Sequence, residues 1–182
     1  MIDADGLLRA DHIASRRLRL SPLVPAHAEE LFPVLDDDRL HEFTGGQPDT
    51  IEQLRARLER WAAERSPDGG EAWLNWLVRS VSDDRIVGTM QATVARGTHG
   101  QVAVVAWTVG VEEQGRGVAS EAARAVVEWL IAWRVRRIEA HVHPAHAVSA
   151  AVARSAGLSQ TDEVVDGEVV WRRSIAPPPG AG

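Results

Sequence analysis

Alternating polar and apolar residues predict strands along much of this 182-residue chain. Arginine and leucine alternate at the start of Arg17–Leu23, and a period of two is typical of a half-buried strand. Further short runs, rich in valine and other apolar residues, are separated by turn residues. One of these turns is the Asp-Gly pair at 166–167, which favours a tight hairpin. The runs cover residues 75–81, 86–95, 102–109, 138–142, 161–165 and 168–175.

Apolar residues spaced by three and four positions predict helices between these strands. The clearest helix covers Thr50–Arg65, and Thr50 together with Gln53 fits a capping box at its start. Another helix is expected to begin at Pro25, because proline is well suited to the first helical position. The remaining two helices are expected over residues 118–133 and 147–156.

The predicted order of elements is βααβββαβαββ. This order fits an α/β (α+β) fold in which a single mixed, mostly antiparallel central sheet is flanked by helices. Residues 1–175 are expected to form one domain, because a chain of this length suffices for one core and is short for two. Residues 176–182 are rich in proline and glycine and are expected to be a disordered tail.

Composition and charge narrow the functional classes. Apolar residues make up 45% of the chain and charged residues 25%, as in ordinary soluble globular proteins. The formal net charge of −6 gives no reason to expect nucleic-acid binding, and no apolar run reaches the ~18 residues of a membrane span. The first residues are acidic and lack the order of a signal peptide, so we expect a cytoplasmic protein.

Three absent residue types limit the chemistry. Without cysteine the chain has no thiolate nucleophile and no cysteine-bound metal, and it has no tyrosine. All basic residues other than histidine are arginine, so a lysine Schiff base is excluded. Proton transfer must therefore use histidine, aspartate, glutamate, serine, threonine, water or the backbone.

The segment Gln114–Ala119 has the character of a phosphate-binding loop. Gly115 and Gly117 let the backbone approach an anion closely, and a helix is predicted to begin directly behind them. A P-loop is excluded because it requires a lysine. A dinucleotide-binding fingerprint would place an acid such as Glu139 at the end of the next strand. Here Glu139 falls inside that strand, and hairpin-linked strands precede the loop.

The sequence around this loop resembles the GNAT N-acetyltransferase superfamily. A strand followed by Gln-x-x-Gly-x-Ala and a long helix is similar to the family's acyl-coenzyme A pyrophosphate loop. The resemblance extends over residues 16–175, and within the family it favours the ribosomal-protein N-acetyltransferase (RimJ/RimL-type) branch. Outside the loop it is carried by Val105–Val109, Val118–Ala122, His143–Ser149 and Gly157–Leu158.

The resemblance implies acetyl-coenzyme A (acetyl-CoA) as acetyl donor and no metal. In the family two neighbouring strands diverge, and the backbone around Val109 and Val111 would then pair with the pantetheine arm. The N–H of Val109 would polarise the thioester carbonyl. The diphosphate would lie on backbone N–H groups of the loop, with side-chain contacts from Arg116 or Ser120. The loop residues concerned are Gln114, Gly115, Arg116, Gly117, Val118, Ala119 and Ser120.

Candidates for proton transfer follow partly from the same resemblance and partly from the alternation of residues along a strand. The segment His143–Ser149 resembles a second motif of the family, the Pro-x-Asn-x-x-Ser opening of its last helix. Ser149 stands at the serine of this motif and is a candidate coenzyme contact and the candidate general acid, although such a hydroxyl can also simply bond the backbone at a helix start. His146 replaces the family's asparagine and is a candidate coenzyme contact. His141 shares a strand face with Glu139 and His143 and is the candidate base, unless water relays the proton.

The acceptor is expected to bind between the first two helices and the last hairpin. Glu42 can attract a cationic amine, and Phe43 and Trp107 are candidate walls of the acceptor pocket. The alternative reading is that the segment around Glu42 is a solvated acidic turn and that the tryptophan belongs to the core.

Together these features predict an N-acetyltransferase. The acetyl group would pass directly, within a ternary complex, to a primary amine of a protein N-terminus or a small molecule. The alternative is a non-catalytic acyl-CoA-binding sensor or scaffold, favoured by the missing tyrosine and by Val104 where many relatives carry glutamate. No nucleic-acid or membrane partner is expected. The chain is expected to be a monomer or a homodimer.

Overall fold

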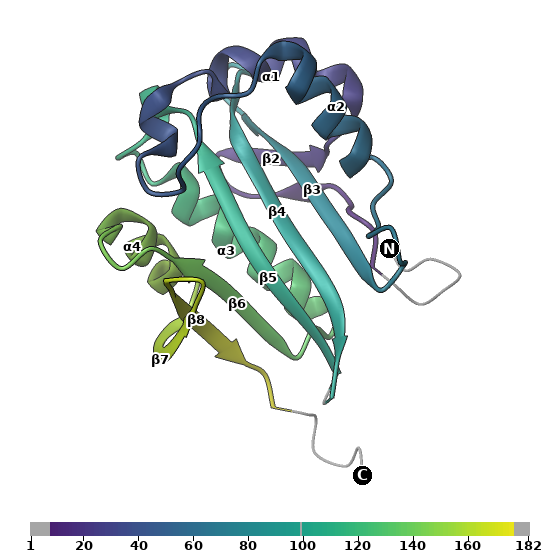
Figure 1. The fold of residues 1–182 in the computed structure, drawn as a ribbon, viewed down its shortest axis with the longest axis vertical. Helices are drawn as coiled ribbons and strands as arrows, with labels where there is room; N and C mark the ends of the chain where they lie inside the picture. The colour runs from purple at the N-terminus through teal and green to yellow at the C-terminus, as the bar shows by residue number, and fades with distance from the viewer. Residues whose placement is uncertain (1–7, 99, 177–182) are drawn as a thin grey trace.

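The computed structural model describes residues 8–98 and 100–176 of the chain. It contains the mixed sheet and the flanking helices that the sequence predicts (Figure 1). The strands are β1 (Ile13–Ala14), β2 (Leu18–Pro22), β3 (Glu71–Ser80), β4 (Ile86–Gly97), β5 (Gly100–Val109), β6 (Arg137–Val142), β7 (Ser159–Val165) and β8 (Glu168–Ser174). Residues 177–182 of the predicted tail lie outside the described residues.

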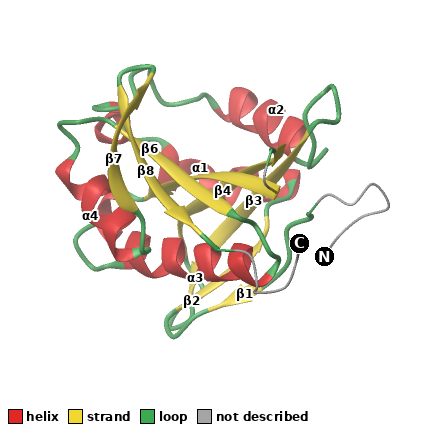
Figure 2. Ribbon diagram, turned by 90° about the horizontal axis from the view of Figure 1, so that it is seen from below, coloured by secondary structure: helices red, strands yellow, loops and turns green. Residues whose placement is uncertain are grey.

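Helices cover both faces of the sheet. Figure 2 shows α3 and α4 on one side of it and α1 and α2 on the other. The α-helices are α1 (Ala28–Leu35), α2 (Ile51–Trp61), α3 (Val118–Ala132) and α4 (Ala147–Ser155). Short 3₁₀ segments are η1 (Pro25–His27), η2 (Asp38–His41) and η3 (Val111–Glu113). Within the described residues, no helix is long and apolar enough to cross a membrane.

The described part of the chain forms one eight-stranded sheet in the order β1-β2-β3-β4-β5-β6-β8-β7. Every neighbouring pair is antiparallel except β5 and β6, which are parallel and are connected through α3. This confirms the predicted fold, with one mixed, mostly antiparallel sheet between helices.

The helix cap and the hairpin turn that the sequence predicts are both present in the structure. The N–H of Gln53 donates to Thr50 Oγ1 at 3.3 Å, and the N–H of Thr50 donates to Gln53 Oε1 at 2.8 Å, which completes the capping box of α2. In the β7–β8 turn Asp166 and Gly167 both have positive φ, as a tight hairpin requires.

Most element ends lie within one to three residues of the prediction, and α1 begins at Ala28 because Pro25–His27 form a 3₁₀ turn. Three differences are larger. The two-residue strand β1 was not predicted, because two residues carry no usable periodicity. The α2 helix ends at Trp61 rather than Arg65, since Glu64 is left-handed (φ 55°) and Arg65 bridges to Ala72 instead. Strand β3 begins at Glu71, four residues before the predicted start, since Glu71–Leu74 already pair with β4.

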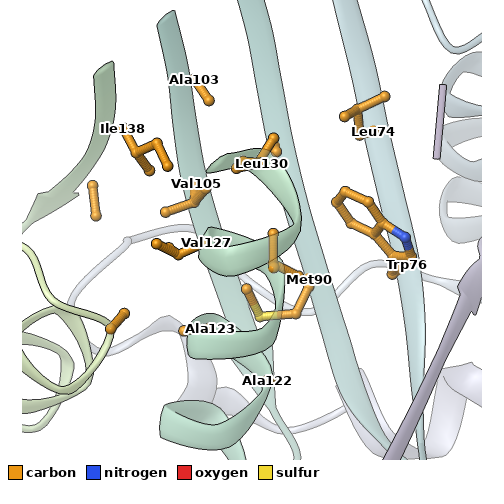
Figure 3. Close-up of a cluster of buried hydrophobic side chains, with 14 of the residues drawn as sticks. Leu74, Trp76, Met90, Ala103, Val105, Ala122, Ala123, Val127, Leu130 and Ile138 are labelled. Carbon is orange, nitrogen blue, oxygen red and sulfur yellow. The ribbon is translucent and has the colours of Figure 1, made fainter. Parts of the chain in front are cut away.

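The main hydrophobic core lies between the sheet and α3 (Figure 3). The small Ala122 and Ala123 allow α3 to approach the sheet, and Leu130 fills the space further along the helix. A second, separate cluster lies on the opposite face, beneath α1 and α2. Its buried members are Leu23, Ala28, Leu31, Leu54, Leu58, Leu77 and Ile86.

Trp76 is the largest fully buried side chain of the main core. Its indole N–H donates to the backbone oxygen of Asp11 at 2.8 Å, and its ring meets Trp129 edge to face with centroids 5.5 Å apart. It therefore connects the N-terminal segment, β3 and α3.

Replacing Trp76 by alanine should lower the free energy of unfolding by about 3–5 kcal/mol, because the substitution leaves a large cavity and an unpaired carbonyl. Urea unfolding followed by circular dichroism measures this change. Val81→Ala is the control, since Val81 is 50% exposed and its truncation should change stability by less than about 0.5 kcal/mol. Equal, small effects of the two substitutions would contradict the assigned packing of Trp76.

Candidate active site

The parallel strands β5 and β6 separate part-way along their length. They pair only from Val102 with Arg137 to Val104 with Glu139, and beyond this point each continues without the other. Strand β5 remains paired with β4 as far as Val109, and β6 remains paired with β8 as far as Val142. A V-shaped gap between two sheet edges results.

The backbone of Val109 points into this gap. The N–H of the next residue, Gly110, donates to Val87 O on β4 at 3.0 Å. Because successive residues of a strand direct their N–H and C=O groups to opposite sides, those of Val109 and Trp107 face away from β4. An extended ligand with amide groups can pair with such an open strand edge.

The strand β5 leads directly into the predicted anion-binding loop. After η3 the backbone turns through Gly115 (φ 72°) and Gly117 (φ 76°), and α3 begins at Val118. A Cβ atom on Gly115 would have no heavy atom within 4 Å, so the loop is open on that side. The N–H groups of the first turn of α3 and its dipole favour an anion at this position.

The side chains of the loop support its shape. Gln114 Nε2 donates to Val109 O at 3.2 Å, which fixes the end of β5. Arg116 Nη1 lies 3.1 Å from Glu113 Oε2, so this guanidinium pairs within the loop. Ser120 lies in the first turn of α3, and Val111 begins η3. The loop residues named from the sequence are thus brought together at one corner of the molecule.

Trp107 and Ser149 meet across the gap. The indole Nε1 of Trp107, on β5, donates to Ser149 Oγ, on α4, at 3.4 Å. Trp107 is half-buried and packs against the main core, whereas Ser149 lies in the first turn of α4. The sequence identified both residues but gave no indication that they are in contact.

Phe43 reaches the start of α4 from the segment between η2 and α2. Its ring stacks on His146 with centroids 4.1 Å apart and an interplanar angle of 13°, and it lies 5.7 Å from the ring of His143. Burial lowers the pKa of His146, and the neighbouring charge of Glu42 partly opposes this shift while His143 adds to it. The lowered pKa favours the neutral form of His146, which can both donate and accept a hydrogen bond.

Glu139 lies at the point where β5 and β6 separate. It is buried, and its Oε1 accepts from Arg172 Nε at 2.6 Å and lies 3.2 Å from Arg137 Nε. His141 Nε2 is 3.9 Å from Glu139 Oε2. Both side chains alternate with core residues of β6, so they face the side of the sheet that carries α1 and α2.

A small hollow of about 100 Å³ lies on that same face. Trp61 and Trp73 form part of its wall, and Asn75, Gln91 and Thr93 supply uncharged polar groups. In the sheet register Thr93 stands beside Val104, and Val104 stands beside Glu139, so the hollow and the gap share one row of the sheet. Trp61 was not predicted as a site residue, because it lies on the apolar stripe of the α2 helix and such a stripe equally predicts a core residue.

The sequence missed Arg17 as a site residue. Its Nη1 donates to Arg116 O in the loop at 3.1 Å, and its Nε donates to Glu121 Oε2 at 2.6 Å. No local pattern could reveal contacts between residues so far apart in the chain.

Comparison with known proteins identifies the family. A model described as an acetyltransferase (GNAT) domain matches residues 17–159. The chain belongs to the GNAT family of acetyltransferases. The family expected from the loop and the second motif is thereby confirmed, and the chain is an N-acetyltransferase of this family. No curated protein sequence matches it.

Solved GNAT structures have the same fold. A GNAT acetyltransferase from Bacillus anthracis shares 17% identity with a TM-score of 0.72, covering 90% of this chain and 98% of that one. RimL, a ribosomal α-N-protein acetyltransferase in complex with coenzyme A, shares 16% identity with a TM-score of 0.72, covering 91% and 98%. AAC(6')-Ib in complex with paromomycin and acetyl-CoA shares 17% identity with a TM-score of 0.70, covering 86% and 93%.

The Phe43–His146 stack makes a prediction about titration. Phe43→Ala should raise the pKa of His146 toward the ordinary histidine value of about 6.5, because water then reaches the ring. Titration of the histidine ring protons by NMR measures the change, and His146→Gln identifies the signal. An unchanged midpoint in the alanine variant would show that Phe43 does not shield His146.

Proposed function

We propose that this chain, as one domain over residues 1–175, transfers the acetyl group of acetyl-CoA directly to a primary amine. The observation that carries the proposal is the continuity of β5 with the anion-binding loop. The strand leaves β6, presents the backbone of Val109 to the gap, and continues into the left-handed glycines at the start of α3. One uninterrupted segment thus offers amide pairing and then an anion site, in the order that a pantetheine arm and a diphosphate require.

The site residues have separate roles in this proposal. Acetyl-CoA supplies an activated thioester. Backbone groups of Val109 and Val111 hold the donor's amide-bearing arm, and the N–H groups from Gln114 to Ser120 hold its diphosphate. The N–H of Val109 stabilises the negative charge that develops on the carbonyl oxygen during attack. Because these donors are fixed by the sheet and the helix, they need little rearrangement during the reaction.

Ser149 and His141 are proposed to handle the protons. Ser149 lies beside the gap, where Trp107 orients its hydroxyl as an acceptor and leaves its own proton available for the leaving thiolate. His141 lies next to the charge-compensated Glu139 on the side that carries α1 and α2, and it takes the proton of the attacking amine. In this proposal His146 donates a hydrogen bond to the donor arm from the start of α4.

The acceptor is proposed to enter from the face that carries α1 and α2. Glu42 is exposed beside Phe43 and is proposed to attract a protonated amine, and the hollow lined by Trp61 and Trp73 is proposed to hold another part of the acceptor. Similar structures include a ribosomal-protein α-N-acetyltransferase and an aminoglycoside acetyltransferase. These support an α-amino group of a protein or an amine of a small molecule as the acceptor.

Calorimetric titration with acetyl-CoA tests the donor site, with NADH and ATP as controls. We expect selective micromolar binding, equivalent to about −8 kcal/mol. Gly117→Trp should abolish binding, because an indole occupies the loop and strains a left-handed position. Gly167→Trp is the matched control, since Gly167 is also left-handed but lies in the distant β7–β8 turn. Equal affinity of both variants would place the donor site elsewhere.

Turnover separates the enzyme from a sensor that only binds acyl-CoA. Thiol release should require both acetyl-CoA and an amine from a panel of N-terminal peptides and small amines. Binding of acetyl-CoA without thiol release from any amine would support the sensor instead.

Ser149→Ala should lower kcat by at least about tenfold while the affinity for acetyl-CoA changes less than about twofold. Ser155→Ala is the control on the same helix, because the Ser155 hydroxyl donates to Val152 O in the last turn of α4. Steady-state kinetics with both variants provides the comparison. If Ser149→Ala retains full turnover, Ser149 is not the acid.

A further inference from the structure

Arg17 lies in the turn between β1 and β2, yet its side chain reaches the start of α3. Its Nη1 donates to the backbone oxygen of Arg116, the residue between the two left-handed glycines, at 3.1 Å. Its Nη2 lies 3.5 Å from the position that a Cβ on Gly117 would occupy. The guanidinium therefore lies directly against the anion-binding loop.

Glu121 connects the same turn to α3. Its Oε1 accepts from Ser15 Oγ and from the N–H of Arg17, both at 2.8 Å, and its Oε2 accepts from Arg17 Nε at 2.6 Å. The Glu121 side chain is only 17% exposed. Three hydrogen-bond donors from residues 15–17 thus hold the carboxylate of Glu121 near the start of α3.

This carboxylate stands close to where the proposed diphosphate would lie. An uncompensated negative charge there would repel the ligand, and the repulsion is stronger where water is partly excluded. Arg17 compensates the charge of Glu121 and also holds the carbonyl of Arg116. Arg116 pairs its own guanidinium with Glu113, whereas Arg17 contacts the loop from the turn that precedes β2.

We propose that Arg17 is a positioning residue for the diphosphate of the donor, acting by neutralising Glu121 and by fixing the peptide between Arg116 and Gly117. This inference rests on the proposed function, because it assumes acetyl-CoA as ligand. It adds to the donor site a residue from an element that the loop motif does not include.

The competing explanation is an ordinary surface ion pair. Arg19 provides the matched case: it lies on β2 two residues further along, and it pairs with Asp84, with side chains 57% and 67% exposed. Exposed pairs of this kind contribute little. The two arginine-to-alanine variants remove the same charge from the same part of the chain, and only one of them touches the loop.

The experiment compares Arg17→Ala and Arg19→Ala with two donors. Acetyl-CoA carries the diphosphate, whereas S-acetylpantetheine lacks it. For Arg17→Ala we expect the Kd and KM of acetyl-CoA to rise about tenfold while kcat stays unchanged, since a charge-assisted contact to the loop is lost. Its kcat/KM with S-acetylpantetheine should stay within about twofold of the wild type. Arg19→Ala should match the wild type with both donors.

A double variant tests the electrostatic part. If Arg17 acts by neutralising Glu121, then adding Glu121→Gln to Arg17→Ala should restore part of the affinity for acetyl-CoA. We expect the double variant to recover about half of the loss in log Kd that Arg17→Ala causes. Arg17→Lys keeps the charge without the forked geometry and should fall between the wild type and Arg17→Ala. Arg17→Lys also tests the proposal if Arg17→Ala does not fold.

The outcomes are separable. Wild-type affinity for acetyl-CoA in both Arg17→Ala and Arg17→Lys would overturn this inference and leave the proposed function intact. An equal loss with both donors would also overturn it, because the effect would then not involve the diphosphate. Failure of the wild-type protein to bind acetyl-CoA at all would instead overturn the proposed function.

Discussion

The separation of β5 from β6 is the constraint on which the rest of the site depends. Two strands can part only if each keeps its backbone bonds elsewhere, since unpaired buried amides are costly. Here β4 holds β5 as far as Val109, and β8 holds β6 as far as Val142. The antiparallel pairs on either side therefore stabilise the opening in the middle of the sheet. The gap in turn sets where α3 begins and how far Trp107 must reach to meet Ser149.

Much of this architecture could be predicted from the sequence, because it follows from local chemistry. The capping box of Thr50 and Gln53, the Asp166-Gly167 turn and the glycines of the loop each depend on neighbours within a few residues. The α3 helix was predicted for the same reason, since its apolar stripe is regular. The family resemblance added what periodicity cannot provide, namely that two strands diverge beside the loop.

What could not be predicted depends on contacts between distant residues. The start of β3 was placed too late because Glu71–Leu74 are held as strand by pairing with Ala92–Ala95 of β4, and a pairing between distant residues leaves no local pattern. Whether a tryptophan belongs to the core or to the hollow is decided by register: Trp76 faces α3, whereas Trp73 faces the opposite side. The contact of Arg17 with the loop likewise exists only once β2 lies beside α3.

The charges around the loop explain how an acidic chain can offer an anion site. Glu113 lies within 3.2 Å of guanidinium nitrogens from Arg85 and Arg116, and Glu121 is held by Arg17. Each of these carboxylates is matched locally, so the net charge of −6 does not describe the field at the start of α3. Local pairing, rather than overall composition, determines what the loop can bind.

The two hydrophobic clusters lie on opposite faces of the sheet and are separate from each other. The cluster beneath α3 holds the loop and the gap, while the cluster beneath α1 and α2 holds the segment that carries Phe43 and the wall formed by Trp61. Changes of packing in one cluster therefore need not pass through the other. The two clusters nevertheless share strand β3, where Trp76 packs into the first cluster and its neighbour Leu77 into the second, so a one-residue slip of this strand would exchange the contents of both.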